Sequence, residues 1–235
     1  YKAWRAALVD DLDRLAPTLR YRVICGPTGS GKTRLLHALA AEGAQVLDLE
    51  GLACHRSSVL GHLPGQPQPS QKRFDSLVWS QLKGFDPARE VFVESESKKV
   101  GNLRVPDALM DAMRASPCLD LQLPDEERVA LLLEDYAFFL QDPDFFCRRL
   151  DALTQLQGRA VIEDWQAQVR AGQSPAVVRE LLTRHGRAYD LNIQIFNRLQ
   201  HTISGWPGGK PGADDRTRPE RAEPHPKRSL LLAPE

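Results

Sequence analysis

The sequence has no C-x-x-C pair, no long apolar run and no excess of either charge. Its four cysteines are far apart, which argues against a zinc site or a disulfide framework and favours a reducing cytosol. No apolar stretch is long enough to span a membrane and no signal peptide is visible, so we expect a cytoplasmic chain with no membrane partner. Lys plus Arg and Asp plus Glu number 31 each, so any nucleic acid has to be bound by a local cluster of cations.

What is present is a stretch near the N-terminus, Gly26-Pro-Thr-Gly-Ser-Gly-Lys-Thr33, that fits the pattern G-x-x-x-x-G-K-[ST] of a phosphate-binding loop, or P-loop. An apolar run at 21–25 precedes it and leucines at helical spacing follow it, which is the strand–loop–helix setting that the motif requires. Glycines let the backbone wrap closely and turn its N–H groups towards phosphate oxygens. We therefore predict a phosphate site formed by Gly26, Thr28, Gly29, Ser30, Gly31, Lys32 and Thr33.

Carboxylates end two further predicted strands. The strand at 45–49 delivers Asp48 and Glu50, and the strand at 90–94 ends in Glu94, in the form of a Walker B strand. In an open α/β sheet the carboxyl ends of parallel strands gather ligands beside the P-loop. We therefore predict a Mg²⁺ site made of Thr33, Asp48 and Glu94, in which the two acids compete for the role; a solvated strand end is the alternative for Glu94.

The remaining pattern divides the chain into four parts. They are a linker helix at 1–17, a P-loop α/β core at 18–123, a helical half at 124–203 and a disordered tail at 204–235. The core contains helices at 70–82 and 106–113 and a fourth strand at 118–123, and helices are predicted at 126–140, 143–156, 160–169, 175–185 and 190–200. The fold class is α/β, with a P-loop NTPase-like three-layer core and a parallel sheet, followed by a mostly helical C-terminal half.

Three further stretches occur in a fixed order after the P-loop. They are Asp48-Leu-Glu-Gly-Leu-Ala-Cys-His-Arg-Ser-Ser58, Gln68-Pro-Ser-Gln71 and Glu94-Ser-Glu-Ser-Lys-Lys-Val-Gly101. Together the motifs resemble the tRNA 2-selenouridine synthase family, over residues 1–200. Members of that family join an N-terminal rhodanese domain to a C-terminal P-loop domain. This chain, which begins with Tyr1 rather than Met, resembles the P-loop half of such a protein.

The resemblance implies a transferase that modifies 2-thiouridine at the wobble position of the tRNA anticodon. It implies a two-step route, in which geranyl diphosphate alkylates the sulfur and selenophosphate then replaces the geranylthio group with selenium. The implied partners are tRNA, the rhodanese domain and the enzyme that supplies selenophosphate. Because the rhodanese domain and its cysteine are missing from the sequence, we expect binding and geranylation from this chain but no selenation by it alone.

The family motifs also point to polar residues after the second and third strands. His55 and Arg56 follow the second strand, and since Arg binds phosphate oxygens in bidentate fashion, we expect contact with a substrate phosphate or the tRNA backbone. Lys98, Lys99 and Arg104 form a basic cluster after the third strand, which either contacts the tRNA backbone or is simply solvated. The predicted catalytic residues are Lys32, Asp48 and Arg56, and the predicted tRNA-binding residues are His55, Arg56, Lys98, Lys99 and Arg104.

Two other classes of protein share part of this pattern. A small-molecule or nucleotide kinase has the same strand–loop–helix core and the same acids after the second strand. A nucleotide-binding module without chemistry is the other class, although the guanine-reading segment Asn-Lys-x-Asp is not found. Fold does not separate a transferase from a kinase, and the sequence leaves open whether a prenyl diphosphate, ATP or GTP fills the P-loop.

Overall fold

The computed structural model describes residues 2–56 and 61–184 of the 235-residue chain. The helix favoured at 190–200 and the tail predicted at 204–235 lie outside these residues. Within the two described ranges, no helix combines the length and the apolar character that crossing a membrane requires.

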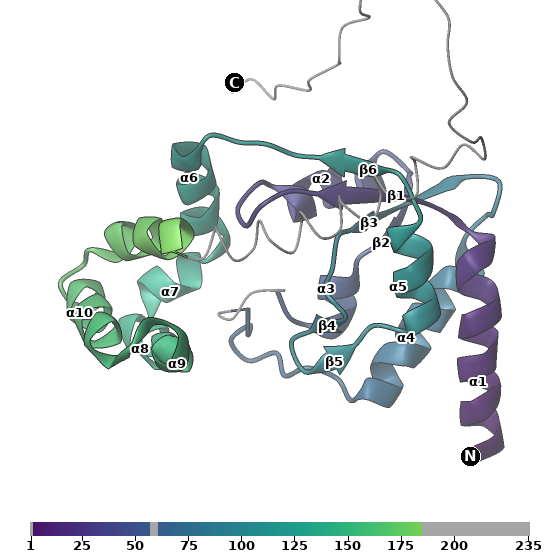
Figure 1. The fold of residues 1–235 in the computed structure, drawn as a ribbon, viewed down its shortest axis with the longest axis horizontal. Coiled ribbons are helices and arrows are strands. Elements are labelled where there is room, and N and C mark those ends of the chain that lie inside the picture. The colour runs from purple at the N-terminus through teal and green to yellow at the C-terminus, as the bar shows by residue number, and fades with distance from the viewer. Residues whose placement is uncertain (1, 57–60, 185–235) are drawn as a thin grey trace, which may run out of the picture. The chain divides into compact units, whose positions relative to one another are not determined.

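Four parallel strands form the central sheet (Figure 1). In spatial order they are β2 (Gln45–Leu47), β3 (Glu90–Glu94), β1 (Arg20–Cys25) and β6 (Cys118–Asp120). Val23 of β1 lies opposite Val93 of β3 and Cys118 of β6. Because all four strands run in the same direction, their carboxyl ends meet at one edge of the sheet, and this edge carries the P-loop.

Helices cover both faces of the sheet. The elements around it are α1 (Lys2–Leu15), α2 (Lys32–Ala41), α3 (Leu49–Ala53), α4 (Gln71–Gly84), α5 (Asp107–Arg114), a 3₁₀ turn (Ala16–Thr18) and the hairpin β4 (Lys99–Val100) and β5 (Leu103–Arg104). Along β1, Tyr21, Val23 and Cys25 join the hydrophobic core under α4 and α5, and Ile24 points to the opposite face, where α2 lies. The predicted P-loop NTPase-like α/β fold is confirmed.

Helix α1, predicted as a linker, is part of this core. Leu8 and Leu12 are 3% and 2% exposed and belong to the same hydrophobic cluster as the sheet. Asp11 accepts a hydrogen bond from Nε1 of Trp79 on α4 at 2.7 Å. These contacts make α1 an integral layer of the α/β core rather than a free connection.

Several elements end earlier than the apolar pattern predicts. β2 ends at Leu47 because the carboxylate of Asp48 accepts a hydrogen bond from Gly51 N at 2.7 Å, which begins α3. β6 ends at Asp120 rather than at residue 123. The helix predicted at 126–140 is interrupted at Tyr136, whose φ of −111° and ψ of 28° lie outside the helical region. Apolar spacing alone does not locate such interruptions, because it continues across them.

The helical half has a hydrophobic core of its own. Its helices are α6 (Asp125–Asp135), α7 (Ala137–Gln141), α8 (Pro143–Leu150), α9 (Thr154–Gln157), α10 (Arg159–Arg170) and a further helix at 174–184, with a 3₁₀ turn at Asp151–Leu153. Trp165 is fully buried among Phe139, Phe146 and Leu150, and its indole N–H donates to Glu180 at 2.9 Å. The buried indole therefore keeps a hydrogen-bond partner.

The expectation that the cysteines do not pair is wrong for two of them. Cys25 at the end of β1 and Cys118 at the start of β6 form a disulfide, with their Cα atoms 6.2 Å apart. They are separated by 93 positions in the sequence, and only the pairing of β1 with β6 brings them together. Cys54 and Cys147 are free. Cysteine spacing therefore does not establish the redox compartment of this chain.

Candidate functional site

The P-loop, residues 26–31, connects β1 to α2 through backbone conformations that need glycine. Gly26 and Gly29 have φ values of 150° and 81°. A Cβ on Gly26 would lie 2.7 Å from the carbonyl oxygen of Leu121, and a Cβ on Gly29 would lie 2.9 Å from the carbonyl oxygen of Arg128 on α6. The glycines thus serve the turn and also let helix α6 approach the loop closely.

Polar groups of the loop are buried at its base. Lys32 is 9% exposed, and its Nζ donates hydrogen bonds to the carbonyl oxygens of Gly26 at 2.9 Å and Pro27 at 3.2 Å. The hydroxyl of Ser30, which is 4% exposed, has no hydrogen-bond partner among the described residues. Since an unpaired buried hydroxyl costs free energy, the loop offers this donor to an acceptor such as a phosphate oxygen.

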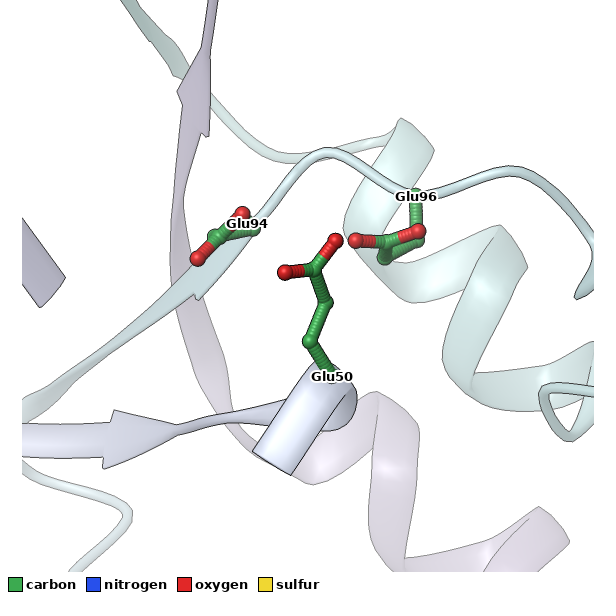
Figure 2. A group of neighbouring side chains, drawn as sticks. All are labelled: Glu50, Glu94 and Glu96. Carbon is green, nitrogen blue, oxygen red and sulfur yellow. The ribbon is translucent and has the colours of Figure 1, made fainter. Parts of the chain in front are cut away.

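Three glutamates gather beside the P-loop (Figure 2). Carboxylate oxygens of Glu50, Glu94 and Glu96 lie within 4.8 Å of one another. Glu94 is 4% exposed, and its Oε1 has no partner among the described residues. Burial, followed by the charge of Glu50, raises the pKa of Glu94 to about 7, against the lowering effects of Lys32 and Thr33.

Asp48 is placed differently from the prediction. Its carboxylate caps α3, as described above, and its Oδ2 lies 3.1 Å from Nε2 of His37. Glu50, two residues further along, is the carboxylate that lines the same cleft as Glu94. Both acids follow β2, and the early start of α3 decides which of them reaches the P-loop.

A cleft of about 500 Å³, part of it open to solvent, lies against the P-loop. Its walls combine the loop, Glu50 and Glu94 with Leu132, Asp135 and Tyr136 from the helical half. The connection between the halves is direct, since Arg128 Nε on α6 donates to the carbonyl oxygen of Thr28 in the loop at 3.0 Å. The cleft is therefore bounded by the P-loop on one side and by the helical half on the other.

His55 and Arg56 have different surroundings. His55 is 4% exposed, and its ring lies edge-on to that of His62, with the centroids 4.8 Å apart. Burial, followed by the charges of His62 and Arg149, lowers the pKa of His55 to about 4, so the ring is neutral at pH 7. A buried neutral ring has almost no surface or charge to offer a tRNA backbone, whereas Arg56 lines the cleft.

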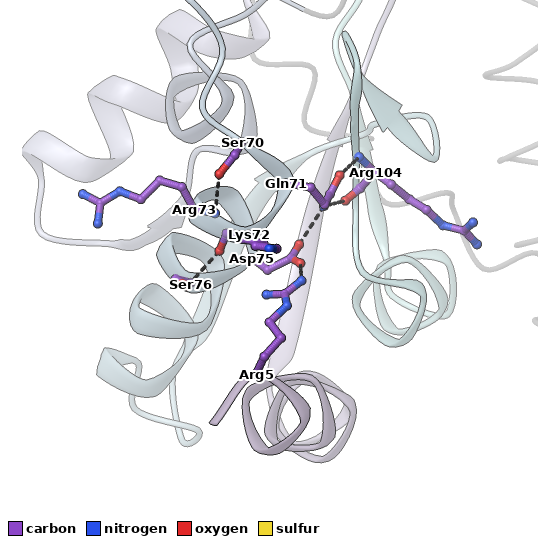
Figure 3. A network of polar contacts seen from close by, with 8 residues as sticks. All are labelled: Arg5, Ser70, Gln71, Lys72, Arg73, Asp75, Ser76 and Arg104. Atoms are coloured by element: carbon purple, nitrogen blue, oxygen red, sulfur yellow. Dashed lines mark hydrogen bonds and ion pairs between the residues drawn. The ribbon is translucent and has the colours of Figure 1, made fainter. Parts of the chain in front are cut away.

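Two glutamines, Gln68 and Gln71, hold the β4–β5 hairpin, and Figure 3 shows Gln71. Gln71 accepts a hydrogen bond from Arg104 N and donates one to Arg104 O, both at 2.8 Å. Gln68 accepts from Asn102 N at 2.9 Å and donates to Val100 O at 3.0 Å. Their amides bond to the hairpin as the edge of a neighbouring strand would. The stretch Gln68-Pro-Ser-Gln71 therefore has a structural role.

The cations predicted to bind tRNA differ in whether they line the cleft. Lys98 and Lys99 are exposed, beside or on the hairpin, and Nη2 of Arg104 donates to both carboxylate oxygens of Asp107, at 3.0 and 2.7 Å. Within the described part of the chain, none of these three cations lines the cleft that contains Arg56. Of the four cations, Arg56 alone is thus placed in the cleft within the described residues, and whether the others contact RNA stays a prediction.

Sequence reasoning missed several residues of the cleft. Arg34 lies on the first turn of α2, directly after Thr33, and its position next to the motif was a usable signal. Leu132, Asp135 and Tyr136 carry no motif and are about a hundred positions from the P-loop in the sequence. Only the packing of α6 on the loop reveals their place.

A P-loop motif between a parallel strand and a helix, with acidic residues at the neighbouring strand ends, defines an α/β protein of the P-loop class. Residues 19–182 match the family described as the tRNA 2-selenouridine synthase AAA domain, and the chain belongs to this family.

The chain is similar to proteins named tRNA 2-selenouridine synthase. The protein from Alcanivorax borkumensis is 36% identical over 160 residues, which cover 66% of this chain and 42% of that protein. Those from Aeromonas salmonicida and Cupriavidus pinatubonensis are each 39% identical, over 138 and 142 residues, covering 58% and 60% of this chain and 36% and 37% of those proteins. The chain therefore spans less than half the length of these relatives. No solved structure matches it.

Proposed function

We propose that this chain is the P-loop portion of a tRNA-modifying transferase that converts wobble 2-thiouridine to 2-selenouridine through an S-geranyl intermediate. The observation that carries the proposal is a family match that extends over the whole P-loop cleft, from β1 to the helical half. The name of the relatives, tRNA 2-selenouridine synthase, supports tRNA as the molecule that is modified and selenium as the element that is introduced. Geranyl diphosphate and selenophosphate are proposed as the other substrates because the resemblance of the sequence motifs to the family implies them.

In this proposal the P-loop binds the diphosphate of geranyl diphosphate. As the sulfur of thiouridine bonds to the first carbon of the geranyl group, the bond between that carbon and the diphosphate oxygen breaks, diphosphate leaves, and the N3 proton of the base passes to solvent. Negative charge then grows on the diphosphate, and Lys32 and the N–H groups of the loop stabilise it. Arg56 assists from the wall of the cleft, and Leu132 and Tyr136 supply apolar surface for the geranyl chain.

The acidic part of the cleft fits a Mg²⁺ ion. Carboxylate and hydroxyl oxygens are the ligands this ion prefers, and Glu94 Oε1 is a buried oxygen without a partner among the described residues. Thr33, Glu94 and Glu50 would hold the ion, with Glu50 in place of Asp48, whose oxygens are engaged elsewhere. When bound, Mg²⁺ neutralises diphosphate charge.

We expect the 235-residue chain to bind geranyl diphosphate more tightly than ATP or GTP in calorimetric titrations with Mg²⁺. The reason is that the cleft combines phosphate donors with an apolar wall. Geraniol, which lacks the diphosphate, is the control for the apolar part alone. Tight ATP binding accompanied by phosphoryl transfer to a small molecule would instead favour the kinase alternative.

The proposed tRNA contact runs through Lys98 and Lys99, with Arg104 beside them. Changing both lysines to alanine should weaken binding of a wobble-thiolated tRNA and flatten its salt dependence by about two units, because each phosphate contact releases counterions. Filter binding across a salt series measures both effects. The matched control is Arg14→Ala with Lys83→Ala, which removes two exposed cations from α1 and α4. An unchanged slope would place the RNA elsewhere, with Arg148 and Arg149 of the helical half as the next candidates.

A further inference from the structure

Two arginines converge on one carboxylate at the P-loop cleft. Asp135, the last residue of α6, accepts hydrogen bonds on Oδ1 from Arg34 Nε at 3.2 Å and Arg34 Nη2 at 2.9 Å. Its other oxygen, Oδ2, lies 3.6 Å from Nη1 of Arg56. The arginines come from α2 and from the segment after α3, and all three residues line the cleft.

The neighbouring Glu134 also pairs with Arg34, at 2.8 Å, but its situation differs. The Glu134 side chain is 64% exposed and that of Asp135 is 26% exposed, and only Asp135 lines the cleft and reaches both arginines. An exposed ion pair contributes little to stability. The convergence at Asp135 is therefore a feature of the cleft and not of the helix surface.

The guanidinium of Arg56 is held over the ring of Tyr136, with its central carbon 4.9 Å from the ring centroid. Stacking occupies the face of the guanidinium and leaves the N–H groups at its edge available. The distance of 3.6 Å between Arg56 Nη1 and Asp135 Oδ2 is longer than a hydrogen bond, so this ion pair is loose. A tetrahedral anion with more oxygens than a carboxylate can bond to both arginines at once.

We infer that Arg34 and Arg56 form a second oxyanion subsite beside the P-loop, in which the carboxylate of Asp135 occupies the place of a phosphate group. The ligand is a phosphate-type anion, carried either by a small phosphorylated substrate or by the RNA backbone. The inference rests on the proposed function in one respect, that the cleft handles phosphate ligands. Asp135 then acts as an internal competitor, and any anion that binds the two arginines has to displace it.

The test measures binding of inorganic phosphate by calorimetry in a Lys32→Ala background, so that the P-loop contributes little to the signal. Adding Asp135→Asn should raise phosphate affinity about two- to fivefold, because an ion pair of this kind is worth roughly that much. Adding Glu127→Gln removes the same charge from an exposed position of α6 outside the cleft and should leave the affinity unchanged. Thermal unfolding of each variant shows whether it is folded.

A double-mutant cycle separates the subsite from a general effect of charge. With Arg34→Ala and Arg56→Ala also present, the gain from Asp135→Asn should disappear, because Asp135 pairs with both arginines. A gain that persists without the two arginines, or an unchanged or lower affinity in folded Asp135→Asn, would overturn the inference. Since the background already lacks Lys32, this result does not depend on whether the P-loop binds geranyl diphosphate.

The source of the phosphate is distinguished by a second arm. An RNA stem-loop of the anticodon is titrated into the wild-type chain and into Asp135→Asn, with and without inorganic phosphate as competitor. A gain for RNA that phosphate abolishes assigns the subsite to the RNA backbone, and a gain for phosphate alone assigns it to a small phosphorylated substrate. No gain for either ligand contradicts the subsite.

Discussion

Lys32→Ala should reduce the affinity for geranyl diphosphate roughly 10- to 150-fold, with the fold retained. The expectation follows from the charge-assisted hydrogen bonds that a buried lysine makes to phosphate, worth about 1.5–3 kcal/mol in total. In this structure Lys32 Nζ is held at the loop by two carbonyl oxygens, within the cleft, so its charge is in place before any phosphate arrives. Calorimetric titration measures the loss.

The matched control is Lys83→Ala, which removes a lysine that stacks on Trp79, outside the cleft. It should bind geranyl diphosphate as the wild type does. If folded Lys32→Ala keeps wild-type affinity, the assignment of the P-loop as the diphosphate site is wrong.

Glu94→Gln should stabilise the chain at alkaline pH and weaken Mg²⁺ binding. The pKa of Glu94 is raised from 4.5 to about 7 in the folded protein, so folding favours its protonated form. Its contribution is therefore fully present below about pH 4.5 and is lost as the pH rises through 7, where a buried charge forms. The neutral amide avoids this cost at every pH.

Thermal unfolding in EDTA at about pH 5 and about pH 8.5 tests the prediction, because the linkage acts between these values. The difference in melting temperature between Glu94→Gln and the wild type should be small at the lower pH and positive at the higher one. Glu42→Gln, at an exposed position, should show no such trend. A variant that is less stable than the wild type at the higher pH would show that the Glu94 carboxylate is satisfied when charged.

Most of the α/β core could be predicted because its signals are local. The P-loop pattern contains its own strand, turn and helix, and the strand predicted at 90–94 has the bounds that the structure shows. The continuous apolar run Val23-Ile24-Cys25 at the end of β1 reflects a sheet covered on both faces, which the neighbouring helical patterns imply. In these stretches the residues that determine the structure are close together in the sequence.

The parts that could not be predicted depend on contacts between distant segments. The disulfide between Cys25 and Cys118 forms because β1 pairs with β6. The residues of one strand alone do not predict which strand it pairs with. The choice of Glu50 over Asp48 depends on one capping hydrogen bond that ends β2 early. The place of Asp135 depends on how a helix packs on the P-loop, a hundred positions away.

The contact between α6 and Gly29 has a thermodynamic consequence. Because Gly29 has no side chain, Leu132 and the backbone of α6 pack directly on the loop, and α6 can occupy its position only while the loop keeps its conformation. A ligand that holds the P-loop in this conformation therefore favours the docked position of α6, and by reciprocity a docked α6 raises the affinity for that ligand. The free energy of binding such a ligand would then be shared between the two halves, and the stability of the helical half would measure the occupancy of the loop.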